Sequence, residues 1–296
     1  MKRKRITKTK ERAIEGVLLA TALSSIFITL SIVFILFVEA LGFFKDVSIK
    51  EFLTGTQWTP LFAQPKFGIL PLISGTLLVT GIAVLVSLPV GLIVAVYLSE
   101  YAPFKVREVA KPILEILAAV PTVVYGYFAL LFFTPILQKL IPNLSGFNAL
   151  SPGMIMGIMI IPYISSVSED SMKAVPMHIR EGSYAMGATK FQTAFKVIIP
   201  SAFSGIAAAF VIGISRAIGE TMVVAIAAGM MPALTLNPLE PIQTLTAYIV
   251  GVSLGDVPHG TLEYKTVFAA GITLFLMTLT LNILGFWFRK RIREVY

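Results

Sequence analysis

The chain alternates between long apolar runs and short polar segments rich in charged residues, proline or glycine. Most runs approach or exceed the roughly 20 residues that an α-helix needs to cross the hydrocarbon layer of a membrane. Because the fourth and shortest run contains Pro162 and several serines, we expect a kinked or cavity-lining helix there. The pattern predicts an all-α polytopic membrane protein with about six transmembrane helices, at about 14–44, 70–98, 112–141, 151–168, 201–231 and 266–288.

The composition supports placement in lipid. The 296 residues are 56% hydrophobic and only 14% charged, against roughly 25% charged residues in a soluble domain. The apolar stretch at about 16–44 is about twice as long as a signal-peptide core, so we expect an uncleaved first span. The net charge of +8 does not indicate nucleic acid binding, because 11 of the 24 lysines and arginines lie in the first 12 and last 8 residues, beside apolar spans.

The distribution of basic residues also predicts the orientation. The two termini and the segments 99–111 and 169–200 together hold 18 of the lysines and arginines, whereas the opposite side holds five. Cytoplasmic segments of membrane proteins carry an excess of such residues. Both termini and both basic segments should therefore face the cytoplasm.

Several classes of function find no support in the residues. The chain has no cysteine and its two histidines are far apart, so we expect no metal site. Apart from Glu220 no strong acid lies near the middle of a span, and no HExxH or GxSxG motif is present, which argues against a membrane-embedded enzyme. The motif GxxxxGK[ST] is also absent, so ATP would have to bind to a partner chain. A secondary transporter remains an alternative, although it would usually need more spans or an internal repeat.

The segment at 169–200 has the pattern of two short helices joined at a glycine. Residues 177–186 suit about three helical turns, Gly187 can supply the turn that ends them, and an amphipathic pattern restarts after it. The small residues Ala185 and Ala188 beside Gly187 would let another protein approach closely. The sequence therefore favours either an elbow that docks to a partner or a linker that rests at the membrane interface.

A charged pair marks the fifth apolar run. Arg216 lies near its midpoint and Glu220 follows one turn later. An arginine at that depth costs at least about 2.5 kcal/mol, so it normally faces protein or a water-filled path. Along one helix the two residues can pair. The pair would either fix the helix packing or hold a guanidinium ready to bind a tetrahedral oxyanion through two hydrogen bonds.

Small residues recur at every fourth position of the same run, at Ser201, Gly205, Ala209, Gly213, Ala217 and Thr221. Such a seam lets a second helix pack closely. If that helix belongs to a partner subunit, Arg216 and Glu220 would line the path between the subunits.

The spacing in the cytoplasmic segment resembles the EAA motif of bacterial ABC importer permeases, the binding-protein-dependent transport inner-membrane components. Glu181, Gly182 and Ser183 are followed by Gly187 and, nine residues later, by a VIIP sequence that ends at Pro200, with Gly182 and Ser183 where the family has alanines. The resemblance implies the type I ABC importer permease architecture. It also implies that the loop is a coupling helix that contacts the cytosolic ATPase, through Arg180, Glu181, Gly182, Ser183, Ala185, Gly187 and Ala188.

Three further segments, at 67–103, 115–130 and 215–222, look like the PstC-type permease of phosphate-specific importers. The resemblance implies that Arg216 and Glu220 serve phosphate passage. It implies a heterodimer with a PstA-type permease, a dimeric PstB-type ATPase that binds ATP and magnesium, and an extracytoplasmic PstS-type phosphate-binding protein, with no cofactor in this chain. A PstA-type permease and a permease for another oxyanion remain alternatives.

On that resemblance the chain divides into two parts. Residues 1–65 would hold the cytoplasmic tail, the first transmembrane helix and an outer segment. Residues 66–296 would form the permease core, with the coupling loop at 169–200.

Overall fold

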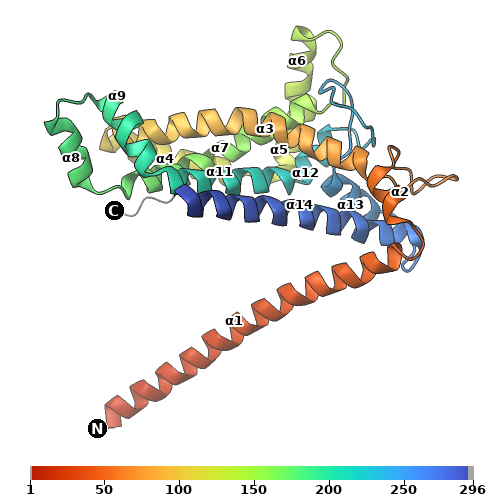
Figure 1. The fold of residues 1–296 in the computed structure, drawn as a ribbon, viewed down its shortest axis with the longest axis horizontal. Helices are drawn as coiled ribbons and strands as arrows, with labels where there is room; N and C mark the ends of the chain where they lie inside the picture. The colour runs from red at the N-terminus through yellow and green to blue at the C-terminus, as the bar shows by residue number, and fades with distance from the viewer. Residues whose placement is uncertain (1, 293–296) are drawn as a thin grey trace.

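A computed structural model describes residues 2–292, which form an almost entirely helical chain (Figure 1). Within that range the only β-structure is two isolated bridges, between Trp58 and Phe67 and between Gly229 and Ile242. Three short π-helical stretches, η1–η3, interrupt the α-helices. The elements are α1 Lys2–Phe43, α2 Ile49–Thr54, α3 Leu70–Val96, η1 Tyr97–Tyr101, α4 Phe104–Ala119, α5 Thr122–Phe128, η2 Ala129–Phe133, α6 Thr134–Leu140, α7 Leu150–Lys173, α8 Met177–Ala185, α9 Lys190–Thr193, η3 Ala194–Ile198, α10 Ile199–Ser201, α11 Phe203–Ile218, α12 Met222–Ala227, α13 Leu245–Ser253 and α14 Leu262–Ile292.

The number of membrane-crossing helices agrees with the expectation from the apolar runs. Five described helices are long and apolar enough to cross a membrane, and the number is six if the pair Lys190–Ser201 and Phe203–Ile218, which is bent by 72°, counts as one broken span. The fourth run, the least certain by length, becomes the 24-residue helix α7, which continues through Pro162. It is the most buried of the five unbroken spans.

Glycines bring the helices around α7 into close contact. A Cβ on Gly157 of α7 would lie 2.8 Å from the Val86 side chain of α3, and a Cβ on Gly213 of α11 would lie 2.9 Å from Ile164 of α7. Neither position has room for a larger residue. The small-residue seam of α11 therefore packs against α7 of the same chain, and not against a partner subunit as one expectation had it.

Two predicted spans are broken in the structure. The run at 112–141 is interrupted at Pro121, so that α4 is a separate helix and the span itself covers Thr122–Leu140. Proline lacks an N–H and disfavours the helical conformation in the residue before it, and Val120 is accordingly extended. The run at 201–231 ends its first helix at Ile218 and resumes as the short helix α12.

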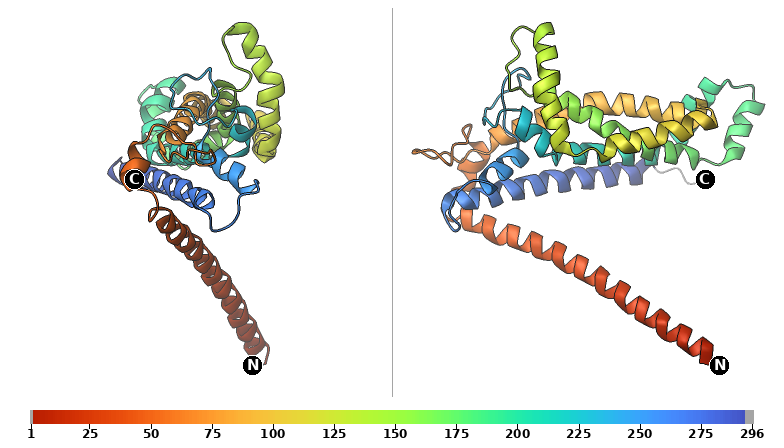
Figure 2. Two further views of the ribbon diagram at one scale, coloured as in Figure 1. Left: turned by 90° about the vertical axis from the view of Figure 1, so that its right-hand side faces the viewer. Right: turned by 180° about the vertical axis from the view of Figure 1, so that it is seen from behind.

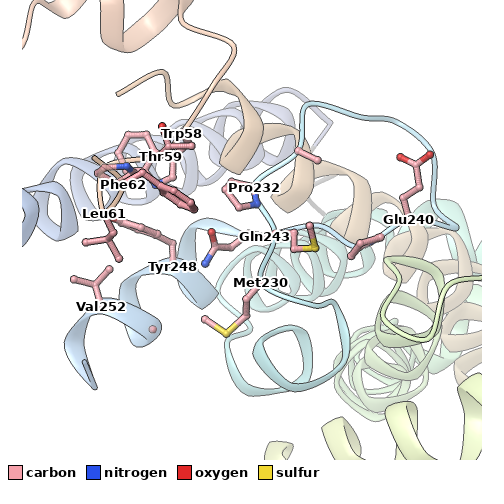
Figure 3. Close-up of a pocket in the computed structure, with 15 residues that line it drawn as sticks. Trp58, Thr59, Leu61, Phe62, Met230, Pro232, Glu240, Gln243, Tyr248 and Val252 are labelled. Atoms are coloured by element: carbon pink, nitrogen blue, oxygen red, sulfur yellow. The ribbon is translucent and has the colours of Figure 1, made fainter. Parts of the chain in front are cut away.

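The segment between α1 and α3 closes one end of the bundle. Helix α2 and the Trp58–Phe67 bridge carry aromatic side chains into a buried cluster with Phe43 of α1 and Tyr248 of α13. Beside this cluster lies a cavity of about 620 Å³, and Figure 3 shows Trp58, Tyr248 and Met230 among the side chains around it. Its lining is mostly apolar.

The opposite end of the molecule holds α8, α9 and the end of α14, and the N-terminal end of α1 points the same way (Figures 1 and 2). Helix α1 diverges from the bundle, and most of its described side chains are exposed. An even number of spans is consistent with this arrangement. Arg293, one of the C-terminal basic residues counted in the sequence, lies outside the described residues.

Candidate functional site

Arg216 lies in the last turn of α11, and the break between α11 and α12 lies about midway along the bundle (Figure 1). Its guanidinium carbon stands 4.2 Å from the centre of the Tyr163 ring of α7. The Nε atom is buried without a hydrogen-bond partner. Within residues 2–292 the side chain makes no ion pair and no hydrogen bond, so the guanidinium is held by an aromatic face and its donors are free.

Glu220 is placed differently from the expectation of one continuous helix. Because α11 ends at Ile218, Glu220 falls in the break before α12, where its Oε1 accepts hydrogen bonds from the backbone N–H groups of Met222 (3.1 Å) and Val223 (3.4 Å). Thr246 of α13 donates to its backbone carbonyl at 2.6 Å. The two described side chains form no ion pair, and the pairing of Arg216 with Glu220 along one helical face is wrong for this structure. Both residues still lie at the same helix break.

Two tyrosines bind the end of α4 at the Pro121 break. Tyr125 donates its hydroxyl hydrogen to the carbonyl of Leu117 at 2.7 Å, and Tyr163 donates to the carbonyl of Ala118 at 3.1 Å. The last carbonyls of a helix lack intrahelical donors, and Pro121 has no N–H to offer Leu117. Tyr163 thus connects the Arg216 guanidinium to the end of α4.

A second charged site lies toward the end of α7 near the coupling loop, and the sequence reasoning missed it. Glu169 is 0% exposed and forms ion pairs with Lys111 (2.6 Å), Arg107 (3.5 Å) and Lys173. Burial lowers the pKa of the Lys111 amine, but hydrogen bonds to Glu169 and Asp170 outweigh that effect and raise the pKa above its ordinary value of 10.5. The sequence did contain a signal for this site: Glu169 lies at the end of an apolar run, and Arg107 and Lys111 are four residues apart.

A cavity of about 220 Å³ lies between α4 and α7 beside this charged site. Lys111 and Glu169 line one part of it, and Tyr163 also lines it. The cavity therefore extends from the Glu169 ion pairs to the Tyr163 ring, which contacts Arg216. Lys111 lies on α4, and Glu169 and Tyr163 both lie on α7.

The segment at 169–200 forms the expected elbow. Helix α8 ends at Ala185, Gly187 has φ of +80°, and α9 begins with a capping box in which Thr189 and Gln192 exchange hydrogen bonds. Nothing lies within 4 Å of a Cβ added at Gly187. Glycine is therefore required there by the backbone conformation and not by lack of space.

The residues assigned to the coupling loop divide into exposed and inward-facing ones. Arg180 faces inward, where its side chain is 12% exposed and donates to the carbonyls of Val175 (2.6 Å) and Met172 (2.7 Å) and to Glu100 (3.2 Å). Ser183 is partly buried and shares a hydrogen bond with Thr193. The others lie at or near the surface of the elbow: Glu181, Gly182, Ala185, Gly187 and Ala188.

Two exposed apolar side chains lie close to the turn of the elbow, and the sequence reasoning had not selected them. Met186 is 88% exposed and Phe191 is 62% exposed. Met186 directly precedes Gly187, and Phe191 follows it by four residues. Their polar surroundings in the sequence gave no periodic signal that separated them from buried apolar residues.

The chain was compared with known protein families. A model described as the binding-protein-dependent transport system inner membrane component matches residues 87–294. The chain belongs to this family. It is an ABC importer permease, a multi-pass membrane subunit, and the expected all-α type I importer architecture is confirmed.

Relatives of the permease match most of its length. It is 34% identical to a probable ABC transporter permease protein, YqgH, of Bacillus subtilis, over 90% of this chain and 87% of the relative. It is 31% identical to a probable phosphate transport system permease protein PstC of Methanocaldococcus jannaschii, over 89% of this chain and 91% of the relative. These values confirm the resemblance to PstC-type permeases.

The fold of the permease matches a solved transporter of different sequence. A bacterial ABC transporter involved in the import of the acidic polysaccharide alginate superimposes with a TM-score of 0.68 at 17% identity, covering 98% of this chain and 100% of that one. Identity at this level concerns the fold alone.

Proposed function

We propose that this permease carries inorganic phosphate across the cytoplasmic membrane as the PstC-type subunit of an ATP-driven importer. The names of its PstC relatives support the substrate class. The single structural observation that supports it is the guanidinium of Arg216, which has no carboxylate partner among the described residues.

The geometry of Arg216 suits a transient oxyanion site. A guanidinium presents its N–H donors in one plane, in a fork that matches two oxygens of a tetrahedral anion. An arginine that served only to fix the helix packing would be expected to pair with a buried acid, because an unpaired charge at this depth is costly. Glu220, the nearest acid in sequence, is instead engaged by backbone N–H groups of α12. In the proposed pathway it borders the same helix break.

The proposal includes the partners that the family resemblance implies. A PstA-type permease would complete the pathway, a PstS-type protein would deliver phosphate from outside, and a PstB-type ATPase would bind ATP and magnesium. This chain would need no cofactor of its own. The elbow would dock to the ATPase through its exposed surface, where Met186 and Phe191 offer apolar contact. Both termini would then lie in the cytoplasm with the elbow.

Reconstituted transporter of all four components tests the role of Arg216 through uptake of radiolabelled phosphate. Two charge-assisted hydrogen bonds contribute roughly 1.5–3 kcal/mol each, so Arg216→Gln should lower the uptake rate by at least about 100-fold, and Arg216→Lys should lower it less. Lys265→Gln is the matched control, because Lys265 pairs with Asp46 at the opposite end of the molecule from the elbow. Uptake at the wild-type rate in Arg216→Gln would leave only a packing role.

The same vesicles test the substrate. Phosphate uptake should persist in the presence of excess sulfate or molybdate. Efficient uptake of labelled sulfate, with little uptake of phosphate, would show instead a permease for another oxyanion.

A further inference from the structure

We propose that Tyr163 is a positioning residue for transport, whose ring holds the Arg216 guanidinium with its N–H donors directed into the pathway. The inference rests on the proposed function of Arg216. The observation behind it is the 4.2 Å contact between the guanidinium carbon and the centre of the Tyr163 ring.

An aromatic partner solves a problem that a carboxylate partner would create. The donors of a guanidinium all lie in its plane, so a carboxylate bound there would occupy the atoms that an incoming anion needs. A ring stabilises the cation through its face and leaves those in-plane donors free. Stacking on Tyr163 therefore lowers the cost of the buried charge without competing with the substrate.

The hydroxyl of Tyr163 fixes the ring and is not a substrate ligand. It donates to the carbonyl of Ala118 at 3.1 Å, in the last turn of α4. That carbonyl is available because α4 ends at Ala119, before Pro121. Tyr163 directly follows Pro162 within α7, which is the most buried of the unbroken spans. Tyr163 is thus held from two helices while its face meets the guanidinium.

The accessible part of the guanidinium agrees with this orientation. Nε is the one Arg216 nitrogen that is buried without a hydrogen-bond partner. The terminal nitrogens make no hydrogen bond within residues 2–292 and are not enclosed in the same way. The edge formed by the two terminal nitrogens, which can bind an anion through two hydrogen bonds, is therefore the open edge of the guanidinium.

The test replaces Tyr163 by phenylalanine and by phenylalanines with one, two and three ring fluorines, in the complete reconstituted transporter. Fluorine withdraws electrons from the ring face and weakens its attraction for a cation, with little change of shape. The phenylalanine variant should take up labelled inorganic phosphate within about threefold of wild type. From phenylalanine to trifluorophenylalanine the rate should fall in steps, by about five- to thirty-fold in total.

Tyr127 provides the matched control. It lies on α5, its side chain is exposed, and no ring contact or hydrogen bond involves it within the described chain. The same fluorinated series at position 127 should leave uptake unchanged. A structural role of the Tyr163 ring through its size alone would give an equally flat series at 163.

Three results would overturn the inference: a flat series at position 163, loss of uptake in the phenylalanine variant itself, or full uptake in Tyr163→Leu. Each is distinguishable from failure of the proposed function. If Arg216→Gln abolishes phosphate uptake while the Tyr163 series is flat, only the role of Tyr163 is refuted. If Arg216→Gln transports at the wild-type rate, the pathway role of Arg216 is itself refuted.

Discussion

Glu169→Gln should destabilise the permease, because it removes a buried carboxylate that three cations share. Breaking a buried ion pair by removing one partner costs about 3–5 kcal/mol. Arg107, Lys111 and Lys173 are 26–34% exposed, so part of their charge can be rehydrated after the loss. We therefore expect a cost of about 2–3 kcal/mol.

The assay is thermal unfolding of the purified permease complex in detergent. At roughly 2–4 °C per kcal/mol, Glu169→Gln should lower the midpoint by roughly 5–10 °C. The neighbouring carboxylate provides the control: Asp170 is 65% exposed and pairs only with Lys111, at 3.2 Å, so Asp170→Asn should cost less than about 1 kcal/mol. Equal midpoints for the two variants would refute the reasoning from burial.

Three further predictions concern packing, the elbow and pH. Gly213→Ala would place a Cβ 2.9 Å from Ile164 and should lower the free energy of unfolding by about 1–3 kcal/mol. Its control is Gly81→Ala in α3, where the added Cβ meets nothing within 4 Å and should be neutral or stabilising by up to about 1 kcal/mol. Thermal midpoints in the reverse order would contradict the close contact of α11 with α7. Arg180→Ala removes the hydrogen bonds that hold α8 to the carbonyls of Val175 and Met172 and to Glu100. In the proposed importer the ratio of phosphate transported to ATP hydrolysed should therefore fall, and an unchanged ratio would show that the loop base does not depend on this side chain. The raised pKa of Lys111 means that its ion pairs stabilise the fold fully below about pH 10.5 and lose this contribution as the pH rises through the folded-state value. Thermal midpoints between about pH 9 and 12 should therefore fall less steeply in Lys111→Met than in the wild type, and parallel curves would count against it.

Long apolar runs predicted the spans well because a membrane leaves the backbone few alternatives to the helix. Helix α7 shows the strength of this constraint, since it continues through Pro162 despite the missing donor. The breaks were harder to predict. Pro121 ends α4, whereas Pro162 does not end α7. The difference lies in tertiary partners, because Tyr125 and Tyr163 donate hydrogen bonds to the carbonyls that the break at Pro121 leaves without a helical donor.

The candidate site was predicted in its residues but not in its contacts. The depth of Arg216 follows from hydropathy alone, whereas its stacking on Tyr163 depends on how α11 and α7 pack, which no local pattern specifies. The expected pair of Arg216 with Glu220 assumed an unbroken helix. Because the helix breaks, the Glu220 carboxylate instead accepts hydrogen bonds from two backbone N–H groups of α12. The ion pairs of Glu169 with Arg107 and Lys111 join segments about 60 residues apart and lay beyond any short-range rule, whereas its pair with Lys173, four residues later, follows that rule.

The elbow acquires its shape from bonds within the loop and at its base. A left-handed glycine at 187 and the reciprocal bonds of Thr189 and Gln192 set the turn between α8 and α9, and Arg180 holds α8 to Glu100 and to the end of α7. An ATPase that meets this loop does not have to order it first, so little conformational entropy is lost on association. If the ATPase docks to the elbow as proposed, a rigid contact of this kind would also transmit a displacement in either direction, so that nucleotide-driven closure of the ATPase would move α7.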